Sequence, residues 1–279
     1  MNVANEPVAI VGMACIFPGA PDVDSYWSNI VAGVDAIGEP PADWHADRYL
    51  DPSSADNDRV YTSRGGWLGE LATFDPLSYG VMPSSVDGGE PDQYLALRVA
   101  QAALEDADLA GADRSRTGVI IGHGTYINRG FGNVMQHGVV IDQTLRILQQ
   151  LHPEHDAAWL RGLKERLIAE LPPFDAGMAP GLVPNVMSGR IANRLDLMGP
   201  NFTVDAACAS SLVAVDLAMT ELLAGRSDVM LAGECTPRHR RRSCRSSASW
   251  RPSPGPAGSG RSPRTPTAHC SAKASASSS

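Results

Sequence analysis

The sequence has 279 residues, which is room for one large domain or two modest ones. With 43% hydrophobic and 19% charged residues, it is not a wholly disordered chain, a collagen or a disulfide scaffold. The net charge of −8 conceals a division: residues 238–279 hold nine basic and no acidic residues, whereas residues 1–237 carry a net charge of −17. The acidic body argues against a nonspecific nucleic-acid binder.

Several other classes of protein are also disfavoured. No run of 18 strongly apolar residues predicts a membrane span, and no basic region precedes the first apolar run, as a signal peptide would require. The five cysteines are scattered without a CxxC pair, so we expect no disulfide framework and no metal site. Phosphate-binding glycine motifs are missing, which disfavours a bound nucleotide cofactor. A reducing, cytoplasmic location fits these features best.

Along the body, apolar runs alternate with helical periodicity. An irregular segment at 35–66, rich in Pro, Asp, Ser and Gly, separates the first helix from the second. The predicted strands are 7–14, 117–122, 203–206 and 229–232, and the predicted helices are 22–32, 91–109, two within 139–171 broken near Pro153, and 207–224. Strands alternating with helices indicate a layered α/β fold.

After Pro237 this pattern stops. Residues 238–279 contain twelve Ser, five Pro and no Leu, Ile, Val, Phe or Met. Such a segment cannot bury enough apolar surface to offset its ordering entropy, so we expect a disordered basic tail.

One cysteine lies where a strand is predicted to enter a helix. Cys208 follows the run Val204-Asp205-Ala206-Ala207 and precedes a helix that is apolar on nearly all sides, which predicts that this helix is buried. Unpaired N–H groups and the helix dipole favour an anion in the first turn, and therefore the thiolate. Small neighbours leave room for a substrate. The alternative is an inert core cysteine, which is common.

The residues around Cys208 resemble the active-site motif of β-ketoacyl synthases, the condensing enzymes of polyketide and fatty-acid assembly. Further similarities follow in colinear order over about residues 6–237. They are the segment 199–212 around Cys208, the preceding 189–197, the N-terminal 8–14 with Phe17-Pro18-Gly19 and Tyr26-Trp27, then 40–44 and Phe74-Asp75-Pro76. Residues 1–237 are therefore interpreted as the N-terminal region of a β-ketoacyl synthase.

The resemblance implies a thiolase-like fold, two similar α/β halves in five layers (α-β-α-β-α), of which this chain would hold the first half plus the catalytic helix. It implies no directly bound cofactor, because substrates arrive on the phosphopantetheine of an acyl carrier protein. Family members are homodimers. An incomplete domain predicts exposed apolar surface, marginal stability and aggregation.

By the same resemblance, Cys208 is the nucleophile that accepts the acyl chain, and its backbone N–H contributes to the oxyanion hole. A malonyl-type carrier thioester then loses CO2 and attacks the acyl-cysteine in a decarboxylative Claisen condensation. Two later histidine motifs normally drive that step, and neither is present around His239 or His269. The role is not transferred to His123, which is expected to be a loop residue. His45, His137, His152 and His155 are expected at the surface or at helix ends.

One landmark differs from the family pattern. Where multimodular synthases usually carry Asp-Pro-Gln-Gln-Arg, this chain has Glu90-Pro91-Asp92-Gln93-Tyr94. The turn at Gly122-His123-Gly124-Thr125 and the helices at 139–171 look closer to the iterative type of polyunsaturated-fatty-acid and enediyne synthases.

The basic tail has two interpretations. Two Lys against 21 Arg indicate a GC-rich coding sequence, and such DNA read in a shifted frame yields Arg, Ser, Pro and Ala. A frameshift near residues 236–242 would then have ended the family sequence, leaving a chain unable to condense. Alternatively, the tail is genuine and the chain is a non-enzymatic interaction protein that binds nucleic acid or an acidic partner. A third hypothesis is a thiolase-like or acyl-loading transferase that needs only Cys208.

Overall fold

A computed structural model describes residues 7–56, 58–109, 112–124, 128–174, 178–236 and 269–277. The chain divides into two compact units. Unit 1 comprises Met1–Asp75, Pro91–Tyr126 and Asn185–Ser279, and unit 2 comprises Pro76–Glu90 and Ile127–Pro184. Unit 1 contains a five-stranded sheet, whereas the regular structure described in unit 2 is helical.

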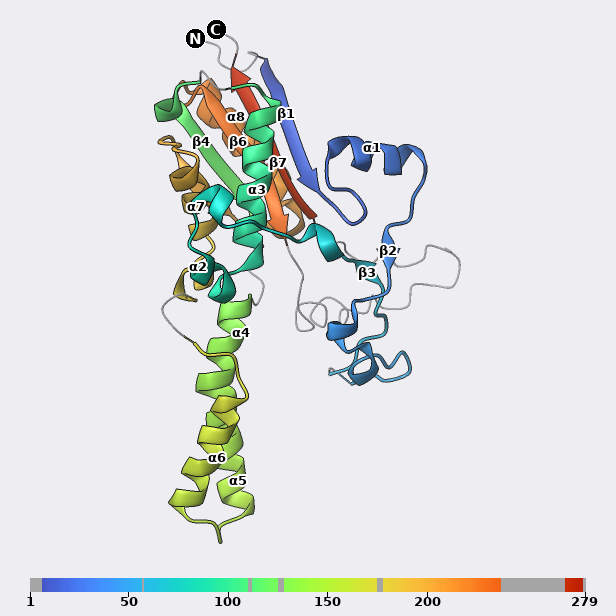
Figure 1. The fold of residues 1–279 in the computed structure, drawn as a ribbon, viewed down its shortest axis with the longest axis vertical. Helices are drawn as coiled ribbons and strands as arrows, with labels where there is room; N and C mark the ends of the chain where they lie inside the picture. Colours follow the sequence, from blue (N-terminus) through green and yellow to red (C-terminus); the bar gives the residue numbers. More distant parts are fainter. Residues whose placement is uncertain are drawn as a thin grey trace. The chain divides into compact units, whose positions relative to one another are not determined.

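The sheet of unit 1 has the strand order β1-β7-β6-β4-β5 (Figure 1). Its strands are β1 (Val8–Ile16), β4 (Thr117–Gly122), β5 (Asn201–Val204), β6 (Val229–Thr236) and β7 (His269–Ser277). β4 pairs in parallel with both β5 and β6, and β7 pairs antiparallel with both β1 and β6. A second sheet joins only β2 (Ile37–Gly38) and β3 (Gly65–Gly66), within the segment that was expected to be irregular.

Two helices cover opposite faces of the main sheet. Side chains alternate between the faces of a strand. On one face, Ile120, Met230 and Ala232 pack against α8 (Ser210–Leu223) in the main buried cluster. On the other face, Cys235 and His123 reach α3 (Pro91–Asp106), where each contacts Asp92. The sheet is therefore enclosed between α3 and α8, as the α/β pattern predicted.

Glycines allow both helices to approach the strands closely. A Cβ atom at Gly12 of β1 would lie 2.5 Å from the carbonyl oxygen of Ala103 in α3. One at Gly122, the last residue of β4, would lie 2.7 Å from the backbone of Ser210, where α8 begins. Any larger residue at either position would push the helix away from the sheet.

Unit 2 is built around a helical hairpin. α4 (Arg129–Met135) continues through a π-helical segment, Gln136–Val140, into α5 (Ile141–Leu151), and α6 (Ala157–Ala169) returns after a short turn. The Asp156 side chain caps α6 by accepting a hydrogen bond from the Trp159 N–H. The predicted break near Pro153 is confirmed. A short helix, α2 (Pro83–Gly88), also belongs to this unit.

Most predicted elements occur within a few residues of the expected bounds. The Asp22 side chain caps α1 (Val23–Val31) as expected, and the hydrogen bond from the Ser25 N–H lowers the pKa of the Asp22 carboxyl. β4 has its predicted bounds, β5 begins and ends two residues earlier than predicted, and β6 extends to Thr236. Three described α-helices were not predicted: α2, α4 and α7 (Val186–Arg194), of which α7 packs on α3, β4 and β5.

The prediction of a tail without regular structure needs correcting for residues 269–277. These residues form β7, which fills the position between β1 and β6. Backbone N–H and C=O groups on both neighbours can pair with any extended segment, so a strand there does not depend on apolar side chains. Residues 237–268 and 278–279 lie outside the described residues.

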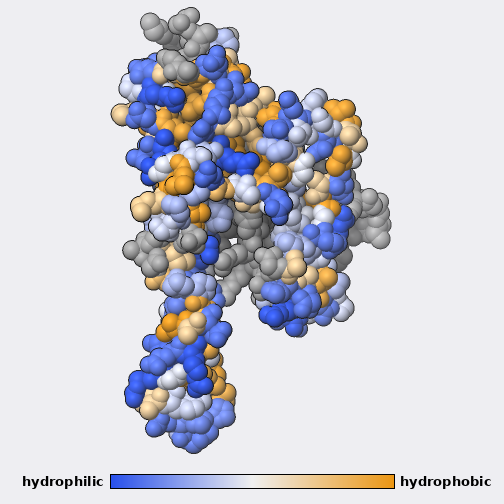
Figure 2. All heavy atoms as spheres, viewed as in Figure 1, coloured by the Kyte–Doolittle hydropathy of each residue, from blue (hydrophilic) through white to orange (hydrophobic). Residues whose placement is uncertain are grey.

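The helix after Cys208 is less buried than its composition predicts. Of its residues only Ser210, Ala214, Ala218 and Leu222 are buried, one stripe at i, i+4 spacing. The Leu212 side chain, by contrast, is 74% exposed. Hydrophobic residues also reach the surface elsewhere in unit 1, in the upper part of the view in Figure 2. The expected exposure of apolar surface is therefore confirmed for this helix.

Candidate active site

Cys208 lies in a single 3₁₀ turn, Ala207–Ala209, between the end of β5 and the start of α8. The residue before it, Ala207, has φ +50°, a left-handed conformation that is strained for alanine. Strained backbone of this kind often occurs at functional sites because it aims one side chain. The predicted strand–turn–helix context of Cys208 is therefore present.

Hydrogen bonds from the side chains of Ser210 and Asp205 hold the turn. The buried Ser210 hydroxyl accepts from the Ala206 N–H (2.9 Å) and donates to the Ala207 carbonyl oxygen (2.7 Å). The Asp205 carboxylate accepts from the Ala207 N–H (3.0 Å). The three consecutive peptide groups between Asp205 and Cys208 are thereby held, which offsets the strain at Ala207.

The Cys208 side chain is exposed and not in a disulfide, whereas Cys15 and Cys235 are buried. It precedes a 14-residue helix, so it lies near the positive end of the helix dipole and its unpaired N–H groups. Its exposure gives a thioester access to the thiol. The arrangement can perform nucleophilic acyl transfer. The inert-core alternative is inconsistent with the exposure.

A buried histidine–aspartate pair was not predicted. His123, directly after β4, is 8% exposed, and its Nε2 lies 2.8 Å from Oδ2 of Asp92 on α3. Its Nδ1 is buried and has no hydrogen-bond partner among the residues that the structure describes. His123 lies in the loop after β4, as expected, but its ring is buried against α3. In the described part of the chain, no hydrogen bond links the Cys208 thiol to a histidine.

The altered landmark at residues 90–94 has structural roles. The Glu90 carboxylate accepts hydrogen bonds from the N–H groups of Arg129 (3.1 Å) and Gly130 (2.6 Å), at the start of α4. Pro91 begins α3. The Tyr94 ring is buried with the Arg190 guanidinium 4.5 Å above it, and burial raises the pKa of the Tyr94 hydroxyl. The helix α7, which carries Arg190, is thereby fixed to α3.

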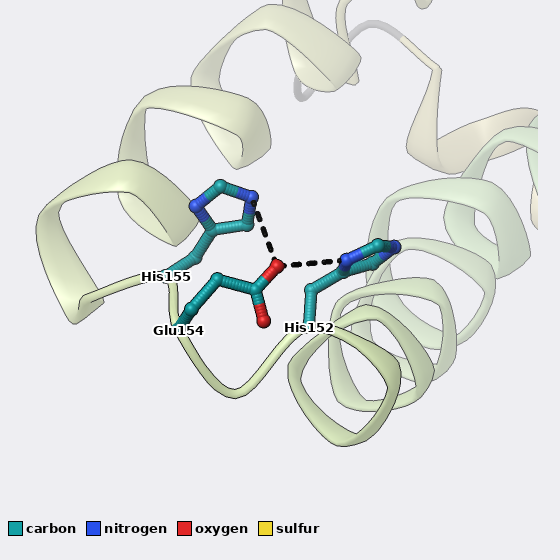
Figure 3. Close-up of side chains that lie close together, drawn as sticks. All are labelled: His152, Glu154 and His155. Carbon is teal, nitrogen blue, oxygen red and sulfur yellow. Dashed lines mark hydrogen bonds and ion pairs between the residues drawn. The ribbon is translucent and has the colours of Figure 1, made fainter.

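A cluster of two histidines and a glutamate occupies the turn of the α5–α6 hairpin (Figure 3). Glu154 Oε1 lies 3.0 Å from His152 Nδ1 and 4.0 Å from His155 Nε2, and the His155 ring stacks on Trp159. Hydrogen bonds from its own backbone N–H and then from His152 hold the pKa of Glu154 below its usual range. All three side chains reach solvent, and the two contacts of Glu154 hold them together.

The other two histidines expected at the surface or at helix ends are partly exposed, and His137 lies within the π-helical segment between α4 and α5. His137 Nε2 contacts the Pro172 carbonyl oxygen at 3.0 Å, and His45 has φ +51° between two short 3₁₀ turns. Among the described helices, none combines the length and apolar character needed to cross a membrane.

Comparison with known proteins agrees with the resemblance. The family model for the β-ketoacyl synthase N-terminal domain matches residues 5–253. A polyunsaturated fatty acid synthase of Thraustochytrium sp. is 34% identical over 235 residues, which are 82% of this chain and 8% of that protein. Polyketide synthase PksN of Bacillus subtilis is 32% identical over 234 residues, 82% of this chain and 4% of that protein. The iterative subtype stays a prediction.

Solved structures share the fold. An oxazolomycin ketosynthase domain from Streptomyces albus matches with a TM-score of 0.65 and 25% identity, covering 88% of this chain and 37% of that one. The ketosynthase from module 6 of the bacillaene synthase of Bacillus subtilis matches with a TM-score of 0.68 and 24% identity, covering 97% and 40%. The expected thiolase-like fold is confirmed, and the chain spans well under half of these ketosynthases.

Proposed function

The chain belongs to the β-ketoacyl synthase family, and from that premise we propose that Cys208 accepts an acyl group from an acyl-carrier-protein thioester. The observation that carries this proposal is the exposed Cys208 thiol, held by Ser210 and Asp205 at the start of α8. The inferred substrate is an acyl chain carried on phosphopantetheine, and no other cofactor is required.

The proposed step is a transthioesterification. The Cys208 thiolate attacks the thioester carbonyl carbon and forms a tetrahedral oxyanion, towards which the backbone N–H of Cys208 is the inferred donor. The carbon–sulfur bond to the carrier then breaks and the carbonyl reforms as acyl-Cys208. The departing phosphopantetheine thiolate takes up the proton that the Cys208 thiol released.

Condensation itself is not expected of this chain. The later histidine motifs that drive decarboxylation in the family do not occur in its sequence. His123 does not substitute for them, because its Nε2 is occupied by Asp92 and its ring is buried. The proposed activity is therefore acyl loading without carbon–carbon bond formation.

Intact-mass spectrometry after incubation with an acyl-carrier thioester tests this proposal. We expect the protein to gain the mass of one acyl group, mapped to Cys208, and to release no CO2 from a malonyl carrier. Cys208→Ser should reduce the adduct to background, because serine is a poor nucleophile without a base, while the buried Cys15→Ser serves as the matched control. An adduct that survives in Cys208→Ser would refute the assignment.

We further propose that residues 238–279 are out of frame, so that the family sequence ends near Pro237. Support comes from the charge division and the arginine-rich composition of the tail. The rival function is an interaction protein that works through this tail. Deleting residues 238–279 and measuring salt-dependent binding to nucleic acid separates the two, because a functional basic tail would lose affinity on deletion.

The inferred partner is an acyl carrier protein, and the inferred location is the cytoplasm. The Cys208 thiol is free, which is consistent with a reducing compartment. Loss of apolar cover around α8 argues against the homodimer formed by complete members of the family. Size-exclusion chromatography with light scattering measures this, and we expect monomers and irregular aggregates.

A further inference from the structure

β7 is enclosed by other elements on both edges and both faces. It is paired along its length on both sides, for example Ser271 with Cys15 of β1 and with Glu234 of β6 (Figure 1). It also contacts α3 and α8, which cover the two faces of the sheet. A strand enclosed in this way is normally a nearly continuous run of Val, Ile and Leu, with glycine where a helix approaches closely.

The residues encoded at this position do not have that character. The strand reads His-Cys-Ser-Ala-Lys-Ala-Ser-Ala-Ser, without a branched aliphatic or aromatic residue. Two other strands of the sheet do have it: β4 and β6 contain Val119, Ile120, Val229 and Leu231, all buried. The place in the sheet and the residues that fill it therefore disagree.

Reading the same bases one position out of frame removes the disagreement. A triplet that begins at the third base of one codon takes its other two bases from the start of the next codon. The amino acid that the next codon encodes fixes these two bases: TG for Cys, GC for Ala, AA for Lys and TC for most Ser codons. The junction His269–Cys270 reads CTG or TTG, which both encode leucine. The junctions Ala274–Ser275, Ala276–Ser277 and Ser277–Ser278 read NTC, which encodes Val, Ile, Leu or Phe whatever N is.

Glycine appears between these apolar residues. The junction Lys273–Ala274 reads GGC or AGC, glycine or serine, and Ser275–Ala276 reads NGC, which is glycine when N is G. Only the junction Ala272–Lys273, which reads NAA, encodes a charged or amide residue or a stop in every case. Beyond it, where the third bases of codons 273 and 275 are G, the shifted reading places glycine between branched or aromatic apolar residues. Glycine is what close helix approach requires in this sheet, as Gly12 of β1 already demonstrates beneath α3.

The other shifted frame gives no such strand. There, every triplet that begins inside an alanine codon or a TC-type serine codon starts with C, and so encodes Leu, Pro, His, Gln or Arg. Valine, isoleucine and glycine cannot arise from those codons. Only one of the two alternative frames therefore produces a sequence suited to the position between β1 and β6.

We infer that the DNA encoding residues 269–279 carries, one base out of frame, the apolar and glycine-containing strand that belongs between β1 and β6. The inference rests on the proposed loss of frame near Pro237 and names the frame in which the sequence continues. The same frame would restore the missing apolar filling of the sheet under both covering helices.

The nucleotide sequence of the gene tests the inference without requiring any activity. We expect codons 271, 275, 277 and 278 to begin with TC, and codons 273 and 275 to end in G. Serine codons of the AG type would place NAG triplets, which are polar or stop, in the strand. A codon 272 ending in T would create the stop TAA. Either finding overturns the inference but leaves acyl loading at Cys208 intact.

Protein stability gives the second measurement. A chain in which the bases from codon 243 onward are read in the shifted frame is compared with the unaltered chain and with one ending at Pro237. We expect the shifted-frame chain to melt at least about 4 °C higher than either, as a buried apolar strand should provide. An equal or lower melting temperature would overturn the assignment of the strand to this position.

Discussion

The two helices that enclose the sheet of unit 1 differ in how completely they are covered. α3 buries ten of the residues along its length, including the charged Asp92 and the polar Gln93. α8 is richer in Leu, Val and Met, yet it buries only one stripe and leaves Leu212 exposed. The more apolar helix is therefore the less buried one.

The two helices therefore have different roles. α3 stabilises the unit, because it contacts β1, β6, β7 and α7 and carries a buried hydrogen-bonded pair. α8 presents Cys208 at its start and keeps an apolar surface beside it. A helix that is apolar on all sides is suited to burial on all sides, whereas α8 is buried along one stripe only. Substitutions should distinguish these roles.

Truncating a leucine in each helix should have the largest and most unequal effect on stability. Leu97 of α3 is 0% exposed, so Leu97→Ala leaves a cavity and should lower the free energy of unfolding by about 3 kcal/mol. Leu212→Ala on α8 is the matched control and should change it by less than about 0.5 kcal/mol. Urea denaturation measures both. Equal losses would show that α8 is covered in solution.

Removing the carboxylate of Asp92 should have the next largest effect. Asp92→Ala leaves the buried His123 ring without a partner, and we expect a loss of about 2 kcal/mol in unfolding free energy. In a double-mutant cycle with His123→Ala, the two losses should fall short of additivity by at least about 1 kcal/mol. Strictly additive losses would mean that the contact between Asp92 and His123 adds nothing to the free energy of unfolding.

Ser210 at the start of α8 should affect both stability and loading. Ser210→Ala removes the acceptor of the Ala206 N–H and the donor to the Ala207 carbonyl oxygen, so we expect a loss of about 1 kcal/mol. Freed from these bonds, the strained turn should relax and slow the acylation of Cys208. Ser211→Ala, which removes the neighbouring hydroxyl, is the control. If Ser210→Ala is acylated at the wild-type rate, the hydrogen bonds of the turn do not determine the reactivity of Cys208.

Much of unit 1 could be predicted because its signals are local. β4 is a continuous apolar run bounded by glycine, and Asp22 is a capping residue directly before a helical pattern. β5 ends two residues before its predicted end because Asp205 turns back to cap the Ala207 N–H. The helix α7 was overlooked because its polar residues mask the periodicity, although Met187 and Ile191 form its buried side.

The candidate site likewise has a part that the sequence predicts and a part that it does not. Cys208 could be identified from its neighbours in sequence, since the strand, small residues and helix are contiguous. The Asp92–His123 pair could not, because the partners lie 31 positions apart in the chain and only the packing of α3 on the sheet brings them together. Periodicity also predicted α8 to be fully buried. It reports which residues are apolar, but not whether another element covers them.

The far end of α8 should show a small effect that depends on pH. Arg226 donates two hydrogen bonds to Glu221 and holds the pKa of that carboxyl below its usual value. A lowered folded-state pKa adds stability above the unfolded-state pKa, and this contribution disappears as the pH falls through the folded-state value. Glu221→Gln should therefore lower the urea midpoint slightly at pH 7 and leave it unchanged well below the usual glutamate range. Glu165→Gln on α6, for which no ion pair is described, should show no such difference. A deficit in Glu221→Gln that persists undiminished at low pH would mean that packing, rather than the ion pair, closes this end of the helix.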